Sequence, residues 1–140
     1  MDRQNDTALL IGRLLMASLF LAAGIPKAMG GYIGFGKYLG NLGVPSPEIM
    51  SMVATAIEVL APVAIILGVF HHTSALILIA FVIAATFLAH RFWEFPVEQV
   101  TNQRNHFFKN IAVIGGLLFY YVSGPGAFAL GGRSRQAQYA

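Results

Sequence analysis

The sequence predicts an all-α integral membrane protein, an up-down bundle of four helices that cross the bilayer. Composition points to this class, because 11% of the 140 residues are charged and 56% are hydrophobic, whereas about 25% of a typical soluble domain is charged. The distribution of charge points the same way, because no Asp, Glu, Lys or Arg occurs between Glu58 and Arg91. A soluble domain of this length cannot enclose so much apolar sequence in one core.

The same composition excludes several function classes. The formal net charge of +3 is spread over predicted loops and helix ends, and no basic block suited to a phosphate backbone is present, so a nucleic-acid partner is not expected. The chain has no cysteine, which excludes disulfides, iron–sulfur clusters and thiolate zinc sites. Any redox role must therefore belong to a bound cofactor or to a partner protein.

The first predicted span covers residues 8–29 and follows a polar lead at 1–7. Arg13 interrupts its apolar part and no Ala-x-Ala site follows, so a cleaved signal peptide is not expected. Helical spacing places Arg13, Lys27 and the small residues Ala17 and Gly24 on one face. The small residues allow a neighbouring backbone to approach closely.

Residues 30–47 are rich in glycine and aromatic residues and too interrupted to cross the membrane. Apolar residues recur there at helical intervals, which predicts a short helix in the headgroup layer. The second span is predicted at 49–70, with Ser46 as its N-cap and Pro47 at its first helical position.

Glu58 lies near the middle of the second span, where a carboxylate costs roughly 3 kcal/mol to insert and is expected to face protein and a partner. Helical spacing places Ser51, Thr55, Glu58 and Pro62 on one stripe. Pro62 has no N–H to donate to the carbonyl of Glu58. Two interpretations stay open: Glu58 holds the bundle together, or it belongs to a proton, quinone or ligand site.

The third span is predicted at 74–93, after a tight turn through 71–73, and the fourth at 106–123. A polar loop separates them. Residues 127–140 form a small polar tail that is predicted to be mobile.

An up-down topology brings the end of the first span, the start of the second, the end of the third and the start of the fourth to one face. Six residues are therefore the candidate polar cluster for a quinone or a lipid headgroup: Arg13, Lys27, Glu58, His90, Lys109 and Asn110. The competing interpretation is that positive residues simply collect at a membrane edge. For Arg13, which lies inside the opposite end, the alternatives are snorkelling to the interface or an ion pair with Glu58.

Cofactor expectations follow from the same residues. No covalent or metal cofactor is expected, because neither His-x-x-x-His nor Glu-x-x-His pairs occur. A quinone is the candidate ligand. Haem ligation by His90 and His106, on either side of the second loop, is a less favoured alternative.

Several short motifs occur along the chain in a particular order. They are Gly12-Arg13-Leu-Leu, Ala23-Gly24-Ile-Pro-Lys27, Gly43-Val-Pro45, Glu58 followed by Pro62 and Leu67-Gly68, His90, and Phe108-Lys109-Asn110-Ile-Ala-Val-Ile-Gly115-Gly116. In this order and spacing the chain resembles the DoxX family of small membrane proteins, over about residues 9–126. The resemblance implies a four-span membrane domain, at 8–126, in a bacterial inner membrane. Some relatives are subunits of quinone-reducing complexes and others accompany oxidoreductases, so the resemblance supports the fold better than the chemistry.

The functional hypothesis is a membrane subunit or accessory protein of a quinone-linked respiratory or oxidoreductase complex, without independent catalytic activity. Its expected partners are the lipid bilayer and other membrane or redox subunits, or further copies of the chain. The alternatives are a purely structural scaffold that docks partner subunits and, ranked last, a small-molecule permeation protein. Counting positive residues favours the longer loops in the cytoplasm only mildly, so the orientation stays open.

Overall fold

The structure is a computed structural model and describes residues 3–130, within which every regular element is helical. The elements are α1 (Arg3–Pro26), η1 (Lys27–Gly31), α2 (Tyr32–Asn41), α3 (Pro47–Leu67), α4 (His71–Ala89), η2 (Phe92–Glu94) and α5 (Val97–Ser123). The predicted all-α fold class is therefore confirmed.

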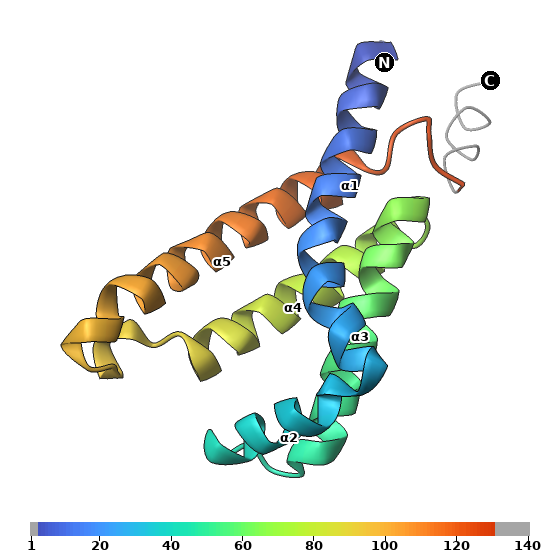
Figure 1. Ribbon diagram of the computed structural model, residues 1–140. Helices are drawn as coiled ribbons and strands as arrows, with labels where there is room; N and C mark the ends of the chain where they lie inside the picture. Colours follow the sequence, from blue (N-terminus) through green and yellow to red (C-terminus); the bar gives the residue numbers. More distant parts are fainter. Residues whose placement is uncertain (1–2, 131–140) are drawn as a thin grey trace.

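The helices form two pairs that share one end (Figure 1). α1 runs along α3, with α2 folded against the beginning of α3, and α4 runs beside α5. The pairs meet where α3 leads into α4 and where α5 reaches α1, and they diverge toward the other end. Because the two helix pairs diverge, polar side chains at that end lie farther apart than they would in a compact bundle.

The α1–α3 contact depends on small residues, as the sequence predicts. Ala17 is fully buried. At Gly24 a Cβ atom would lie 2.8 Å from the carbonyl oxygen of Glu58, closer than real Cβ atoms come to neighbouring atoms. The backbone of α1 therefore rests directly on the backbone of α3 beside the buried carboxylate.

The core lies where the two pairs meet. It consists of Phe20, Ala61, Ile65, Ala75, Leu78, Val82, Leu117 and Tyr120, contributed by α1, α3, α4 and α5. Outside this core many large apolar side chains are exposed, among them Leu15, Leu60 and Phe119. An apolar exterior around helices that satisfy their own backbone groups is the arrangement that a lipid solvent requires.

Three helical segments within residues 3–130 are long and apolar enough to cross a membrane: Arg3–Asn41, Pro47–Leu67 and His71–Glu94. The predicted fourth span falls inside α5. The N-terminal part of this long helix carries Glu98 and Arg104, and its C-terminal part is apolar. The span limits at 106–123 stay a prediction.

A sharp bend follows α1. Gly30 has a φ of 119°, a conformation that L side chains rarely adopt, within the wide turn η1. The bend lets α2 turn back onto α3, so the predicted short helix between the first two spans is present. Its place in the headgroup layer stays a prediction.

Some local predictions need correction. Ser46 stands at the N-cap of α3 but has a left-handed backbone, φ 49°, and its side chain makes no capping bond. The sequence predicts the turn between the second and third spans at 71–73, whereas α4 already begins at His71. The left-handed residues Gly68 and Phe70 reverse the chain earlier than expected.

The chain ends also differ from expectation. α1 begins at Arg3, so most of the polar lead at 1–7 belongs to the first helix. Residues 127–130, the start of the predicted mobile tail, make contacts with the helices. Ala127 N–H donates to Asp6 Oδ1 at 2.9 Å, and Leu130 N–H donates to the carbonyl of Leu67 at 2.9 Å. The mobility of this segment stays a prediction. The rest of the predicted tail, 131–140, lies outside the described residues.

Gly24→Ala is expected to destabilise the protein by about 1–3 kcal/mol, because the added methyl group overpacks against backbone rather than a flexible side chain. Unfolding by denaturing detergent would measure the loss. Gly12→Ala on the same helix is the matched control, because a Cβ there meets nothing within 4 Å. Equal stability of the two variants would contradict the close α1–α3 contact.

Candidate functional site

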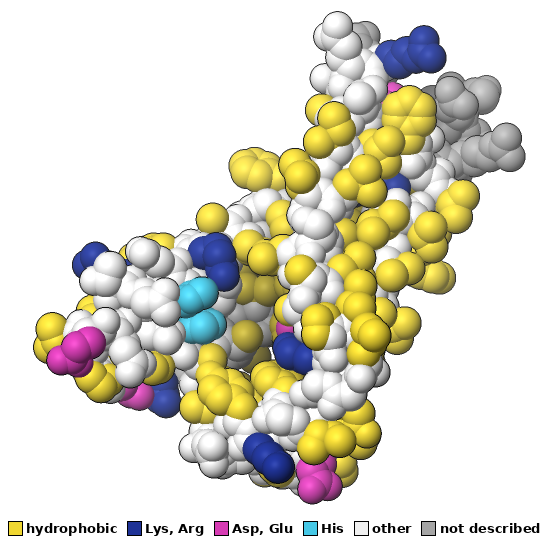
Figure 2. Space-filling view, in the orientation of Figure 1, with side chains coloured by type: hydrophobic (Ala, Val, Ile, Leu, Met, Phe, Trp, Pro, Cys, Tyr) yellow, Lys and Arg dark blue, Asp and Glu magenta, His cyan; other side chains and the backbone are white. Residues whose placement is uncertain are grey.

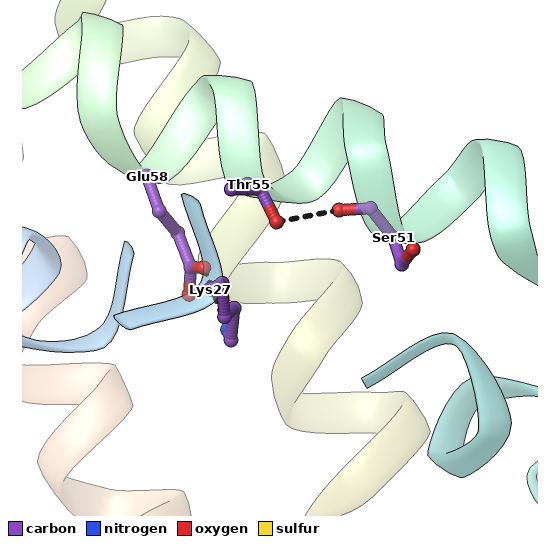
Figure 3. Close-up of polar contacts among 4 residues, drawn as sticks. All are labelled: Lys27, Ser51, Thr55 and Glu58. Atoms are coloured by element: carbon purple, nitrogen blue, oxygen red, sulfur yellow. Dashed lines mark hydrogen bonds and ion pairs between the residues drawn. The ribbon is translucent and has the colours of Figure 1, made fainter. Parts of the chain in front are cut away.

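The site is built around Glu58, which α3 holds on the face turned toward α1 (Figure 3). Its side chain is 7% exposed. Neighbouring turns of α3 place Ser51 and Thr55 on the same buried stripe, as their spacing predicts. Burial of a carboxylate in this position demands a compensating charge or several hydrogen-bond donors.

Lys27 supplies that charge. Its Nζ lies 2.6 Å from Glu58 Oε2, and the lysine side chain is 21% exposed. Lys27 is the first residue of η1, directly after Pro26, so the end of α1 delivers the cation. The ammonium also lies 4.0 Å from the centroid of the Phe35 ring, an attractive cation–π contact provided by α2.

The hydroxyl groups on the stripe do not serve the carboxylate. Thr55 Oγ1 donates to the carbonyl of Ser51 at 2.7 Å (Figure 3), and Ser51 Oγ donates to the carbonyl of Glu48 at 2.8 Å. Both groups are therefore satisfied by the backbone of their own helix. The predicted stripe of polar residues is present, but the polar contact to Glu58 comes from Lys27, which lies outside the stripe.

Arg13 lies near the middle of α1, and within residues 3–130 the ion pair of Glu58 is with Lys27 and not with Arg13, so the proposed Arg13–Glu58 pair is wrong. Snorkelling of Arg13 to the interface stays a prediction. Arg13 is 3% exposed, and its Nε donates to the carbonyl of Ile65 at 2.9 Å. Its Nη atoms donate to the carbonyls of Ile66, Pro125 and Phe128. The last carbonyls of a helix lack helical partners and carry partial negative charge, which explains why a cation is stable there.

The remaining candidates lie together on α4 and α5. The rings of His90 and His106 stack with centroids 5.0 Å apart, and Lys109 Nζ lies 3.2 Å from His106 Nδ1. Asn110 Nδ2 donates to Thr86 Oγ1 at 2.9 Å and ties the two helices together. We name His90, His106, Lys109 and Asn110 the α4–α5 polar group.

The six predicted residues therefore occupy three places. Lys27 and Glu58 form an ion pair, three others belong to the α4–α5 polar group, and Arg13 lies at the far end. Figure 2 shows histidine and cationic side chains on one wall of the hollow between the helix pairs, with cationic and acidic side chains on the other wall. Within residues 3–130 the direct contacts of these residues therefore form separate groups, because the two helix pairs diverge where they lie. A ligand that would meet more than one of these groups stays a prediction.

The geometry does not fit the haem alternative. Axial imidazoles lie on opposite sides of a haem, whereas His90 and His106 stack at an interplanar angle of 20° with no space between the rings. His90 Nδ1 is also in a 2.8 Å hydrogen bond with Gln103 Oε1. Within residues 3–130 no group of three His, Asp or Glu side chains lies close enough to share a metal ion.

Sequence reasoning overlooked several contributors. Phe35 and Gln103 touch candidate residues only because of the bend after α1 and the turn before α5, which no local pattern reveals. Tyr120 is 8% exposed, and among residues 3–130 its hydroxyl has no hydrogen-bond partner. A tyrosine at the apolar end of a span was a usable signal, because buried tyrosine hydroxyls usually find a partner.

Comparison with known proteins supports the resemblance. The DoxX family model matches residues 8–91, more than half of the chain. The chain belongs to the DoxX family. It is 32% identical over 122 residues to the Escherichia coli inner membrane protein YphA, covering 87% of this chain and 86% of the relative. It is also 32% identical over 130 residues to the Escherichia coli inner membrane protein YqjF, covering 93% and 94%.

These matches place the DoxX protein described here in the inner membrane as a multi-pass protein. The family model ends at 91, before α5, whereas the two pairwise matches extend over most of the chain. No solved structure matches the chain.

Removing one partner of the ion pair is expected to destabilise the DoxX protein by about 3 kcal/mol, because it leaves a buried charge alone. Detergent unfolding of Lys27→Met and of Glu58→Met would measure the loss. The double variant Lys27→Met/Glu58→Met should return close to the wild-type value, because an apolar pair of similar volume needs no compensation. Additive losses in the double variant would show that the two side chains do not interact.

Arg13→Lys is expected to cost about 2–4 kcal/mol, because one ammonium cannot reproduce a fork of hydrogen bonds to separate carbonyls. Hydrogen exchange should rise in residues 125–130, which Arg13 holds against the end of α3. Arg3→Lys, at the exposed start of α1, is the control. Unchanged protection of 125–130 in Arg13→Lys would contradict this anchoring role.

Proposed function

We propose that the protein is a membrane accessory subunit of a quinone-linked oxidoreductase complex, in which the Lys27–Glu58 pair forms the polar contact for a quinone or lipid headgroup. The observation that carries the proposal is a buried, salt-bridged carboxylate in the middle of a membrane-spanning helix. Ionisable groups inside a membrane are costly, and where they occur they usually serve substrates, ions or protons.

The pair has the chemistry for such a contact. The ammonium of Lys27 has three donor hydrogens, and a single carboxylate oxygen, Glu58 Oε2, lies within bonding distance in the described structure. The Lys27 side chain is partly exposed, so its ammonium can donate a further hydrogen bond to a carbonyl oxygen. Glu58 lies behind Lys27 and can hold a proton at Oε2 when the lysine ammonium moves away to bond a ligand.

The opposite wall adds further polar groups. The rings of His90 and His106 stack, and His106 lies beside the ammonium of Lys109. A headgroup in the hollow between the helix pairs would therefore meet donors from both walls (Figure 2). A bound quinone supplies two-electron redox chemistry, and the chain's own residues supply position, charge and protons.

Specific contacts favour a second candidate, a structural scaffold. Gly24 allows α1 to rest on the backbone of Glu58, and the ion pair closes over the same contact. In this alternative the pair sets the distance between α1 and α3, and the exposed apolar surfaces dock partner subunits or a second copy. Assembly, rather than turnover, would then depend on Glu58.

Isolation in mild detergent tests the proposal directly. The protein is expected to retain quinone and to co-purify with an oxidoreductase whose turnover falls roughly 10- to 100-fold in Glu58→Gln, the size of a lost acid–base contribution. Turnover is measured per intact complex. Glu98→Gln is the control, because Glu98 is an exposed acid in the first turn of α5.

The outcomes separate the two candidates. Lower complex yield with unchanged turnover per complex would favour the scaffold. A preparation without quinone that keeps full turnover in Glu58→Gln would contradict the headgroup contact.

A further inference from the structure

A cavity of about 380 Å³ lies between α2 and the first turns of α3. This volume falls within the range of ligand pockets, roughly 300–1,000 Å³. The lining residues come from both helices: Tyr32, Ile33, Gly36, Lys37 and Gly40 from α2, and Pro47, Glu48, Ser51 and Met52 from α3. Glu48 and Glu58 are roughly 15 Å apart along α3, at about 1.5 Å per residue, so the cavity is a separate place from the Lys27–Glu58 ion pair.

The backbone holds the walls of this cavity in place. A Cβ atom at Gly36 would lie 3.3 Å from Ser51 Oγ, so α2 rests closely on α3 beside the cavity. Leu39 is buried, and Val44 N–H donates to its carbonyl at 3.1 Å, which closes the turn that leads from α2 to α3. The cavity is therefore formed before a ligand arrives, which lowers the cost of binding.

Two opposite charges line the cavity from different helices. Lys37 comes from α2 and Glu48 from α3, both are exposed, and within residues 3–130 neither forms an ion pair. An acid in the first turn of a helix is stabilised by the helix dipole whatever lies nearby, so Glu48 alone would not indicate a ligand. The unpaired lysine on the same cavity adds a second position of opposite charge, and both charged groups are accessible.

The other polar residues of the lining contribute unequally. Ser51 Oγ is already engaged, because it donates to the carbonyl of Glu48 at 2.8 Å. Tyr32 is half-buried, and a phenolic hydroxyl can donate to a phosphate oxygen. The groups available to a ligand are therefore one cation, one anion and one hydroxyl.

The position of the cavity indicates which ligand reaches it. α1 belongs to one segment that is long and apolar enough to cross a membrane, and α3 forms another. α2 and the turn after it connect the two, and a connection between consecutive crossing helices lies at an edge of the bilayer, where the phospholipid headgroups are. Ile33 and Met52 of the lining are 59% and 53% exposed, so the apolar part of a lipid has a surface to contact.

We infer that this cavity binds the headgroup of a zwitterionic phospholipid with a primary ammonium, as in phosphatidylethanolamine. The phosphate lies beside Lys37, the ammonium beside Glu48, and the first carbons of an acyl chain against Ile33 and Met52. A primary ammonium has three N–H donors for a carboxylate, whereas the quaternary ammonium of a choline headgroup has none. A purely anionic headgroup gains Lys37 but brings its negative charge toward Glu48.

Photoreactive lipids test this inference on the full-length protein. It is reconstituted in phosphatidylcholine nanodiscs that contain a small share of one probe: phosphatidylethanolamine, phosphatidylcholine or phosphatidylglycerol, with identical acyl chains and a diazirine close to the glycerol. Mass spectrometry locates the labelled residues. The phosphatidylethanolamine probe is expected to label the cavity residues about three- to tenfold more than the other two probes, the size of one hydrogen bond to a charged group at a partly exposed site.

Substitutions separate the two charges. Glu48→Gln should lower labelling by the phosphatidylethanolamine probe to the level of the phosphatidylcholine probe and leave the latter unchanged. Lys37→Gln should lower labelling by all three probes, because each carries a phosphate. Glu98→Gln and Arg104→Gln are the matched controls and should equal wild type, because both residues are exposed charges on α5 and do not line the cavity.

Three results would overturn the inference. Equal labelling of the cavity by the three probes would show that its charges select no headgroup. Preferred labelling by phosphatidylglycerol would show that Lys37 acts alone. A preference for phosphatidylethanolamine that persists in Glu48→Gln would show that the ammonium does not lie beside Glu48. The readout depends on neither quinone nor an oxidoreductase partner, so its failure is distinct from failure of the proposed Lys27–Glu58 contact.

Discussion

The arrangement of the first half of the chain depends on neutralising one carboxylate in the middle of a membrane helix. Glu58 is compensated by Lys27 at 2.6 Å, and this contact requires the end of α1 to lie against the middle of α3. Gly24 permits that approach because it has no side chain. The bend that begins at Lys27 then carries α2 back, so that Phe35 covers the ammonium. The Lys27–Glu58 ion pair, the close packing at Gly24 and the bend after α1 are thus all consequences of the need to neutralise Glu58.

Charges at the two ends of the molecule are stabilised by different means. At the Arg13 end a guanidinium is enclosed by carbonyls from the end of α3 and from residues 125–128, and it fixes the segment after α5 to the bundle. At the Lys27 end the ion pair borders the hollow between the diverging helix pairs. The closed end gives the structure its core, and the open end leaves polar side chains within reach of a ligand or partner.

Sequence reasoning anticipated the features that depend on local periodicity. The helical class, the burial of Glu58 and the close approach at Gly24 follow from apolar length and from spacing along one helix. The partner of Glu58 could not be predicted in this way, because Arg13 and Lys27 lie on the same face of α1. Helical periodicity gives the direction in which a side chain points, but not which residue along that face lies level with Glu58. Topology placed His90, Lys109 and Asn110 at the same end as Lys27, but it carries no information on how far two helix pairs diverge. The carbonyls around Arg13 come from an irregular segment without a pattern of its own.

The central claim is that the carboxylate of Glu58 is ionised and in contact with Lys27 inside the bilayer. Solid-state NMR of the protein in lipid, with ¹⁵N at the Lys27 side chain and ¹³C at the Glu58 carboxyl group, measures this distance and the ionisation state together. The account predicts strong dipolar coupling between the two nuclei and a carboxylate chemical shift. A protonated carboxyl signal with no measurable coupling to the lysine nitrogen would contradict it.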